Sequence, residues 1–443
     1  MLINGHNYVY RDYNDLIIIF IPSQNKHIQL ENVYCDFFRL QFEQKLSHDD
    51  TVSSISKIYG IDDYHKISKD LNEFNESLRS VFSDQDINNR RTTNNNQEDQ
   101  INKFMAENKI PFSAIIEITD NCNLKCIHCY RGIKNKTFWT EQSFENTLRQ
   151  LRDLGTLHLT ITGGEPLVHK SFEKFLDLAD HYGFAITIQT NATTGFLRLI
   201  EKLKHLAIED ISISLYSIDP SVHDAITKIN GSHRKTIETI KELRLKNLPV
   251  TINCPVMKQN KLQVRAINNF AKSIKANCNF SFKIIHSSDI NKDTASLNCF
   301  SSKMLFNLMT DHDIRLYNNI IRKINFSQSR QHYCDAGFRS ITIDAQGNVL
   351  ICNAFRKFCG NVEHTHISDI WENSLELTHW RKKTSLINDK CKNCNCYAYC
   401  EPCPAHYYSE TGKDDQIDHL TCSFGQAFYA ASKKAIPIIN LMK

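Results

Sequence analysis

Short apolar runs alternate with longer amphipathic stretches between residues 113 and 286, and no other feature restricts the possible folds as much. The runs AIIEIT, HLTIT, AITIQT, DISISLY, VTINCPV and FSFKII are predicted strands, and stretches such as SFEKFLDLADHYG between them are predicted helices. Six strand–helix units of this kind predict an α/β fold with a parallel sheet covered by helices and curled into a partial (β/α)6 barrel. Functional side chains of such folds gather at the carboxyl ends of the strands.

Composition and charge exclude several classes of partner. The chain has 443 residues, 41% of them hydrophobic, and a net charge of +4, which is too small to predict a nucleic-acid partner. The longest apolar run, LIIIFI at residues 16–21, is too short to span a bilayer and has no signal-peptide cleavage site, so we expect a cytoplasmic protein with no membrane partner. In that reducing compartment the 16 cysteines are expected to be metal ligands where they cluster and buried small side chains where they are isolated.

Changes in composition divide the chain into four segments. Residues 82–103 are polar, rich in Asn and Gln and without an apolar period, so residues 82–109 are expected to form a flexible linker. The linker separates an N-terminal unit, residues 1–81, from the barrel at residues 110–325. A cysteine-rich region, residues 326–443, follows the barrel.

The N-terminal unit is predicted to contain three short strands, NYVYRD, DLIIIFIPS and KHIQLEN, followed by three helices. The third helix carries its apolar residues at spacings of three and four, and Asp49 or Asp50 is expected to cap the second helix. This order of elements resembles the PqqD-like precursor-recognition element of ribosomal peptide biosynthesis, a winged-helix-like module. The resemblance implies that a leader peptide adds as a strand to the edge of the module's sheet, beside the third helix.

A DNA-binding winged helix, or a unit that only packs against the barrel, would show the same order of elements. Acidic side chains on and just before the third helix offset its few basic ones and disfavour binding to DNA. These acidic residues are Asp62, Asp63, Asp70, Glu73 and Glu76.

The stretch EITDNCNLKCIHCYRG, residues 117–132, places three cysteines directly after the first predicted barrel strand. A disulfide requires a pair of thiols, and a closed zinc site requires four ligands. Three thiolates on one loop, from Cys122, Cys126 and Cys129, therefore indicate a metal centre that keeps one position free. A zinc site completed by His128 is the alternative.

The spacing Cys-x3-Cys-x2-Cys after a first strand resembles that of the radical S-adenosylmethionine (SAM) enzymes. The resemblance implies a [4Fe–4S] cluster on Cys122, Cys126 and Cys129, with SAM chelating the fourth iron. It also implies that an electron from the cluster cleaves SAM and releases a 5′-deoxyadenosyl radical, which removes a hydrogen atom from the substrate.

Further residues match the SAM-binding positions of that family. The motif TGGEP follows the second strand and is implied to bind the SAM amino group, whereas His128 is implied near adenine and Lys228 near the SAM carboxylate. Ser214 and Asn191 are candidates for contacts with the ribose hydroxyls, and Ser212 points to the same face of its strand as Ser214. The residues of the TGGEP motif are Gly163, Gly164, Glu165 and Pro166.

A second field of cysteines begins at residue 334. Cys334 and Cys352 flank a predicted hairpin whose turn is DAQGN, and the run CKNCNCYAYCEPC follows. The order resembles the SPASM domain of radical SAM enzymes, which implies two auxiliary [4Fe–4S] clusters and hence three clusters in the chain. The implied ligands are Cys334, Cys352 and Cys403 for auxiliary cluster I, and Cys391, Cys394, Cys400 and Cys422 for auxiliary cluster II.

Two points stay open in this region. Two residues separate Cys400 from Cys403 where the family has three, and no cysteine shortly before Cys334 completes its cluster. The candidates for the missing ligand are Cys359, Cys396 and Cys299, and an open iron that binds substrate or water is the other possibility. A structural zinc ribbon is the alternative for the whole region.

Together these resemblances cover nearly the whole chain and imply a maturase of ribosomally made peptides. The leader is expected to dock on residues 1–81, the core peptide to enter the barrel, and a flavodoxin or ferredoxin to supply electrons. Two auxiliary clusters favour an oxidative crosslink, with a carbon–carbon (cyclophane) bond preferred to a carbon–sulfur (thioether) bond. A sulfatase-maturase-like enzyme, a peptide epimerase and an iron–sulfur redox regulator are the alternatives, and the spacing singles out no catalytic acid or base.

Overall fold

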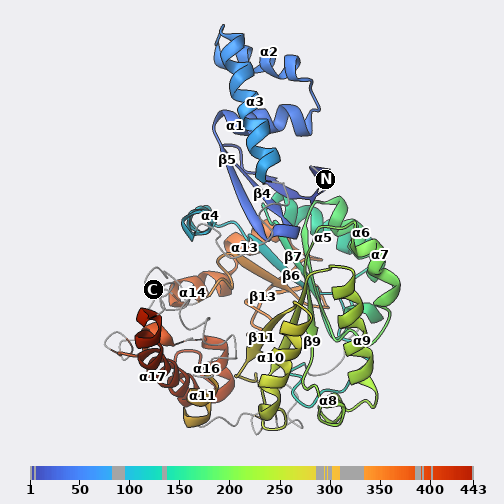
Figure 1. The fold of residues 1–443 in the computed structure, drawn as a ribbon, viewed down its shortest axis with the longest axis vertical. Coiled ribbons are helices and arrows are strands. Elements are labelled where there is room, and N and C mark those ends of the chain that lie inside the picture. The colour runs from blue at the N-terminus through green and yellow to red at the C-terminus, as the bar shows by residue number, and fades with distance from the viewer. Residues whose placement is uncertain are drawn as a thin grey trace.

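The computed structural model shows three parts that lie against one another: an N-terminal unit, a central barrel and a C-terminal region (Figure 1). It describes residues 2–3, 6–81, 95–131, 137–285, 294, 297, 302–309, 334–384, 391, 394–400 and 403–441. Within these residues no helix is both long and apolar enough to cross a bilayer.

Six parallel strands form the barrel, side by side in the order in which they follow one another along the chain. They are β6 (Ser113–Glu117), β7 (His158–Thr162), β8 (Ala185–Thr190), β9 (Ile208–Ser214), β10 (Val250–Pro255) and β11 (Asn277–Ser281). The predicted α/β architecture is confirmed, but the sixth strand begins earlier than the predicted FSFKII. β11 pairs with β10 from Asn277 opposite Thr251 to Ser281 opposite Pro255, so it ends where its neighbour ends.

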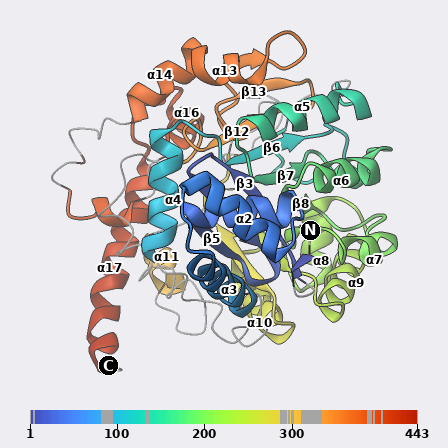
Figure 2. The same ribbon diagram turned by 90° about the horizontal axis from the view of Figure 1, so that it is seen from above.

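Helices cover the outer side of these strands (Figure 2). They are α5 (Glu141–Asp153), α6 (Phe172–His181), α7 (Ile200–Leu203), α8 (Pro220–Thr227), α9 (Ser232–Leu245) and α10 (Val264–Ser273). Strand residues such as Ile188, Ile211 and Ile213 are fully buried in the same core as Phe144 and Phe175, whose stacked rings lie 4.2 Å apart. Alternate residues of the strands face the barrel interior.

The C-terminal region extends the barrel sheet instead of forming a separate one. Its first strand, β12 (Ser340–Ile343), pairs in parallel with β6 along its whole length. β13 (Asn348–Leu350) completes the predicted hairpin, with Gly347 in the left-handed conformation at the turn, and β14 (Phe358–Asn361) adds a further antiparallel strand. The sheet order is therefore β11-β10-β9-β8-β7-β6-β12-β13-β14.

Helices also pack around this extension. They are α11 (Ser302–Met309), α13 (Ile367–Asn373), α14 (Leu375–Thr384), α16 (Pro404–Thr411) and α17 (His419–Leu441). The buried side chain of Trp380 on α14 donates from Nε1 to the carbonyl of Ala336 at 2.7 Å. Because Ala336 lies two residues after Cys334, this bond helps to fix the segment that carries the cysteine.

The N-terminal unit contains the three predicted strands followed by three helices, and a further pair of short strands. A short pair, β1 (Leu2–Ile3) and β2 (His6–Asn7), precedes the antiparallel sheet of β3 (Val9–Asp12), β4 (Leu16–Ile21) and β5 (Lys26–Glu31). The helices are α1 (Val33–Phe38), which continues as a π-helical turn to Glu43, α2 (His48–Tyr59) and α3 (Tyr64–Val81). Ser47, not Asp49 or Asp50, caps α2, because the helix begins earlier than predicted and the Ser47 side chain accepts the Asp50 N–H.

Both faces of β4 are buried, which explains its unbroken apolar sequence LIIIFI. Ile17, Ile19 and Ile21 belong to the core between the sheet and the helices of the N-terminal unit. Ile18 and Phe20 belong to a second cluster, which the unit shares with the barrel. The barrel residues in this cluster include Leu157, Ala185 and Ala207.

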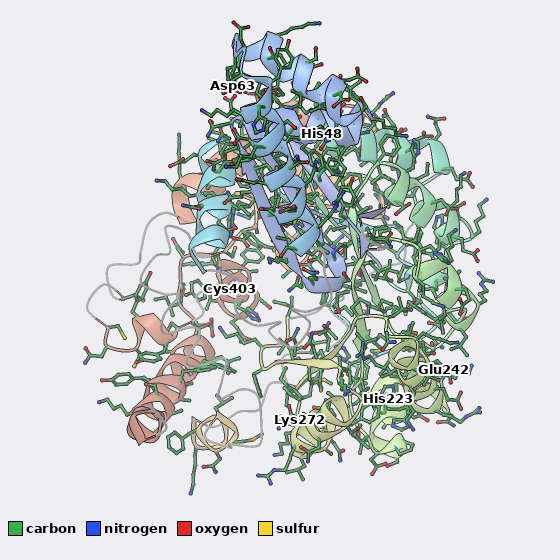
Figure 3. All side chains as sticks on the ribbon, turned by 45° about the horizontal axis from the view of Figure 1, so that its top comes forward. His48, Asp63, His223, Glu242, Lys272 and Cys403 are labelled. Carbon is green, nitrogen blue, oxygen red and sulfur yellow. The ribbon has the colours of Figure 1, made fainter. Side chains whose placement is uncertain are left out.

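These three barrel residues lie at the amino ends of β7, β8 and β9. The N-terminal unit therefore docks at the opposite end of the barrel from the carboxyl ends of the strands. Figure 3 shows the same arrangement, because His48 and Asp63 of the unit lie at the other end of the molecule from His223 on α8.

Arg11 fastens the N-terminal unit to the barrel. Its Nε donates to the carbonyl of Thr156 and its Nη1 to the carbonyl of Gly183, each at 2.7 Å. The guanidinium also lies 4.7 Å from the ring centroid of Phe184, and the residue is only 6% exposed. The docked position is therefore specified by directional bonds as well as by the apolar contact.

Part of the expected linker is a packed helix, α4 (Asn95–Glu107). Ile101 and Met105, four residues apart, are buried in the cluster that joins the N-terminal unit to the barrel. The expectation of a flexible linker is therefore wrong for this helix, because one apolar stripe suffices to hold it. The remainder of the expected linker, residues 82–94, lies outside the described residues.

Replacing Arg11 by Met should loosen the N-terminal unit, because buried carbonyl groups of the barrel lose their donor. A buried polar group left without its partner costs about 1–3 kcal/mol. We expect a lower free energy of unfolding and faster amide hydrogen exchange in residues 154–158 and 182–186. Arg234→Met makes the same change at an exposed site on α9 and should leave both quantities nearly unchanged. Equal exchange in the two variants would show that Arg11 does not fasten the unit.

Candidate active site

The loop with the first three cysteines leaves the carboxyl end of β6 and is held by α8. The backbone N–H groups of Lys125 and Ile127 donate to the carbonyls of Thr227 and Ile226, each at 3.0 Å. These bonds fix the backbone around the cysteines at the end of the barrel where the sequence predicts a metal centre.

The glycines of TGGEP allow the loop after β7 to lie against the cysteine loop. The N–H of Gly164 donates to the carbonyl of Thr119 at 2.7 Å, and the N–H of Glu165 donates to that of Asn121 at 2.8 Å. A Cβ at Gly163 would overlap the Thr119 carbonyl, and a Cβ at Gly164 would overlap the Asn121 carbonyl. Only glycine fits at these two positions, so the motif supports the residues just before the first cysteine.

The side chain of Glu165 is fully buried and bonded within the protein. Its Oε1 accepts the Thr190 hydroxyl at 2.7 Å and the Leu167 N–H at 3.2 Å, and its Oε2 accepts the Asn191 N–H at 2.7 Å. Burial raises the pKa of Glu165 to about 7, although these bonds favour the charged form. The carboxylate ties the loop that continues with Pro166 to the end of β8, and its contact with the SAM amino group stays a prediction.

Asn191 follows β8 directly and touches the cysteine loop. Its Nδ2 donates to Asn123 Oδ1 at 2.8 Å and lies 3.8 Å from Cys122 Sγ. The same thiol accepts the N–H of Leu124 at 3.4 Å. The predicted contact of Asn191 with ribose is untested, whereas the structure places its amide against a predicted cluster ligand.

The polar side chains of β9 lie on the barrel-interior face, and Lys228 lies beside the cysteine loop. Ser212 Oγ accepts a hydrogen bond from Asn253 Nδ2, and Ser214 is hydrogen-bonded to Tyr216. Lys228 is exposed in the left-handed C-cap of α8, directly after the residue whose carbonyl holds the cysteine loop. Their predicted contacts with the ribose and carboxylate of SAM stay predictions.

Tyr216 is a site residue that the sequence prediction missed. Its hydroxyl lies 3.9 Å from Cys126 Sγ, and its ring meets that of His128 edge to face at 4.8 Å. Burial, and then the neighbouring Cys126, raise the pKa of this tyrosine well above its usual value. Its position at the carboxyl end of a barrel strand is the one signal that points to it.

A network of buried charges connects the cysteine loop to the C-terminal region. The carboxylate of Glu117, the last residue of β6, is 1% exposed and is paired with both Arg131 and Arg356. Both of its oxygens lie 3.0 Å from Arg356 Nη1. Arg131 Nη1 also bonds Asp120 Oδ1 at 2.9 Å, and Arg356 Nη2 lies 3.4 Å from Asp344 Oδ2.

This network joins two segments that carry predicted cluster ligands. Arg131 lies two residues after Cys129, and Arg356 lies four residues after Cys352. The uncharged side chain of Trp139 also connects the two segments. Its Nε1 donates to the backbone carbonyl of Glu117 at 2.9 Å and lies 3.1 Å from the backbone carbonyl of Asp344. The sequence prediction missed the network because Glu117 and Arg356 are 239 positions apart, so no local pattern connects them.

Several of the later cysteines lie close enough for their charges to interact, and their division between two clusters stays a prediction. The first group of interacting cysteines contains Cys334, Cys352 and Cys403. The second contains Cys391, Cys394, Cys400 and Cys422, with Cys396 in addition. Burial raises the pKa of Cys352 to about 11 and that of Cys400 to about 12.

The candidates for the missing ligand of auxiliary cluster I lie in different places. Cys359 has Ser374, Glu376 and Arg381 as its polar neighbours. Cys396 lies with the second group, where its thiol is hydrogen-bonded to Cys394. The remaining candidate, Cys299, lies outside the described residues, so the fourth ligand stays open.

The surroundings of the cysteines fit iron–sulfur clusters. A Cβ at Gly425 of α17 would overlap Cys400 Sγ, so this glycine, about one helical turn after Cys422, makes room for the thiol. Among the described residues no three His, Cys, Asp or Glu side chains converge on one point as the ligands of a single metal ion do. A cubane instead distributes its thiolates over separate iron atoms.

Comparison with known proteins identifies two segments of the chain. Residues 116–271 match the Radical SAM superfamily, and residues 334–395 match SPASM, an iron–sulfur cluster-binding domain. AlbA, the antilisterial bacteriocin subtilosin biosynthesis protein of Bacillus subtilis, is 28% identical over 302 residues, which are 66% of this chain and 67% of AlbA. The PqqA peptide cyclase of Xanthomonas axonopodis pv. citri is 23% identical over 301 residues, which are 64% of this chain and 80% of the cyclase.

A solved structure shares the fold over nearly the full length. SuiB of Streptococcus suis, bound to S-adenosylmethionine, superposes with a TM-score of 0.61 at 18% identity, and the match covers 94% of this chain and 98% of SuiB. The two matched segments define the class of protein: residues 116–271 form a radical SAM domain. Residues 334–395 form a SPASM domain, which binds iron–sulfur clusters. The predicted family, barrel core and cofactors are confirmed.

Replacing Gly425 by Ala should displace the Cys400 thiol and remove auxiliary cluster II. We expect the anaerobically reconstituted variant to contain about four iron atoms fewer per chain than the wild type, since a cubane holds four. Gln426→Ala changes an exposed neighbour on the same helix and should keep the full iron content. The same iron and sulfide content in all three proteins would show that Cys400 holds no cluster.

Replacing Glu117 by Gln should leave the guanidinium groups of Arg131 and Arg356 without their shared anion. Breaking a buried ion pair costs about 3–5 kcal/mol, so we expect a lower free energy of unfolding and faster loss of iron to a chelator. Glu141→Gln removes an exposed carboxylate from α5 and serves as the control. If Glu117→Gln loses iron no faster than this control, the network does not hold the cysteine loop.

Proposed function

We propose that the protein modifies a ribosomally made precursor peptide by joining two of its residues in an oxidative crosslink. The observation that carries this proposal is the N-terminal unit, which lies outside the segments that match the radical SAM and SPASM families. By their names, AlbA acts in bacteriocin biosynthesis and the PqqA cyclase acts on a peptide. A structure of SuiB contains a precursor peptide. These relatives support a peptide substrate.

The surface of the N-terminal unit supports docking of a leader peptide. Large apolar side chains on α1, on α2 and at the start of α3 are exposed: Tyr34 by 47%, Ile58 by 59%, Tyr59 by 45% and Tyr64 by 51%. α1 follows directly after β5, which is an edge strand of its sheet. An extended leader can therefore add to the β5 edge by backbone hydrogen bonds and place apolar side chains on the exposed surface.

The carboxyl end of the barrel supplies the chemistry. SAM with its cluster, when bound, supplies a 5′-deoxyadenosyl radical that removes one hydrogen atom from the peptide. Joining the resulting carbon to a second residue releases one proton and one electron, so the peptide loses two hydrogen atoms in total. An auxiliary cluster accepts the electron, and we favour a carbon–carbon bond over a thioether. The barrel interior that the peptide enters carries polar groups of β9 and β10, among them Ser212, Ser214 and Asn253.

Coexpression with candidate precursor peptides taken from the neighbouring reading frames tests the proposed function. We expect mass spectrometry to show a peptide that has lost two hydrogen atoms and that does not fragment between the joined residues. Coexpression with Cys126→Ala should leave the peptide unmodified. An unmodified peptide beside an enzyme that cleaves SAM would contradict the proposal and favour another substrate.

Replacing both Tyr34 and Ile58 by Ser should weaken binding of the leader peptide. Truncating a central apolar contact costs roughly 1–2 kcal/mol, so we expect about tenfold weaker binding or more in fluorescence anisotropy. Cleavage of SAM without peptide should be unaffected. Leu245→Ser changes an exposed apolar residue on α9 and should bind the leader normally. Unchanged binding by the double variant would favour the sulfatase-maturase-like alternative, which needs no N-terminal unit.

A further inference from the structure

Lys283 reaches from the barrel into the C-terminal region. It lies two residues beyond β11, and the ring of its neighbour Phe282 lies 5.9 Å from that of Phe424 on α17. Its Nζ donates to Thr421 Oγ1 at 2.8 Å and lies 5.5 Å from the ring centroid of Phe424. Because Thr421 directly precedes Cys422, the ammonium group lies next to a predicted ligand of auxiliary cluster II.

Asp418 orients the threonine that accepts this hydrogen bond. Its Oδ1 accepts the Thr421 N–H at 2.7 Å, and its Oδ2 accepts the Thr421 hydroxyl at 2.6 Å. With its hydroxyl hydrogen given to Asp418, Thr421 Oγ1 presents only a lone pair to Lys283. Asp418 is 4% exposed. The hydrogen bonds that run from Lys283 through Thr421 to Asp418 are therefore shielded from water.

Cysteines from both groups lie around the same ammonium group. Cys403 of the first group and Cys400 and Cys422 of the second are close enough for their charges to act on Lys283. Burial lowers the pKa of the Lys283 ammonium, and Asp418 and these thiols oppose that effect.

We propose that Lys283 holds a positive charge between the two auxiliary clusters and thereby raises their reduction potentials. Reduction adds an electron to a cluster whose thiolate ligands already make it anionic. A nearby cation in a partly desolvated environment stabilises the added charge, and local charge is one of the factors that set the potential of an iron–sulfur cluster. The inference depends on the auxiliary clusters and not on which bond forms in the substrate.

Lys283 and the cysteines around it come from different parts of the chain. The lysine belongs to the barrel, whereas the cysteines around it belong to the C-terminal region. Its effect on the clusters therefore depends on the contact of Phe282 with Phe424, which holds the two parts together at this point. The auxiliary clusters therefore accept electrons more readily when Phe282 and Phe424 are in contact than when these two rings are apart.

Redox titration monitored by electron paramagnetic resonance tests the role of Lys283. The measurement is made on reconstituted full-length protein in which Cys122, Cys126 and Cys129 are all replaced by Ala, so that only auxiliary clusters contribute. We expect Lys283→Met to shift both potentials to more negative values and Lys283→Arg, which keeps the charge, to restore most of the shift. Lys272→Met removes the same charge from an exposed site on α10 (Figure 3) and should cause no shift.

The outcomes separate a redox role from a structural one. Unchanged potentials in Lys283→Met at full iron and sulfide content would overturn the proposal. If Lys283→Met does not retain its clusters, Thr421→Val replaces it in the test, because this variant keeps the ammonium group but removes its fixed acceptor. We then expect a smaller shift in the same direction, and the absence of any shift would overturn the proposal.

Discussion

One buried carboxylate holds the two halves of the site together. Glu117 ends β6, the strand that pairs with β7 on one side and with β12 on the other. Arg131 reaches this carboxylate from the three-cysteine loop, and Arg356 reaches it from the C-terminal region. Because uncompensated buried charges are costly, the two cysteine-bearing segments resist separation. A shared sheet and a shared ion pair therefore fix the three-cysteine loop relative to the segment that carries Cys352.

The N-terminal unit and the three-cysteine loop lie at opposite ends of the barrel strands. Ile18 and Phe20 contact the amino ends, whereas the cysteine loop leaves the carboxyl end of β6. A leader docked on the unit must therefore be followed by a segment that crosses the barrel from end to end. At about 3.3 Å per residue, a strand length of roughly 20 Å requires at least about six extended residues. This geometry favours a precursor with a spacer between leader and core.

Patterns that are contiguous in the sequence predict much of the fold. The six barrel strands, the three-cysteine loop, the GGEP turn and the hairpin before Cys352 each occupy one short stretch, and the structure contains each of them. The resemblance of their spacing to a family motif implies the division of the later cysteines between two clusters, which stays a prediction. The amino-acid sequence alone therefore predicts the fold class and the main elements of the site.

Contacts between distant residues escape such a prediction. Arg356 and Glu117 are 239 positions apart, and Arg11 and Gly183 are 172 apart, so no local pattern connects them. Helix α4 is missed for another reason, because only a narrow apolar stripe around Ile101 and Met105 interrupts a polar segment. Tyr216 reads as an ordinary strand residue until the structure places its hydroxyl beside Cys126.

Reductive cleavage of SAM tests whether these cysteines form a working radical centre. Protein reconstituted with iron and sulfide is incubated anaerobically with SAM and dithionite, and 5′-deoxyadenosine is quantified by mass spectrometry. The structure and the family together predict that the wild type forms 5′-deoxyadenosine and that Cys126→Ala does not. Intact SAM after incubation with fully loaded wild-type protein would contradict the account.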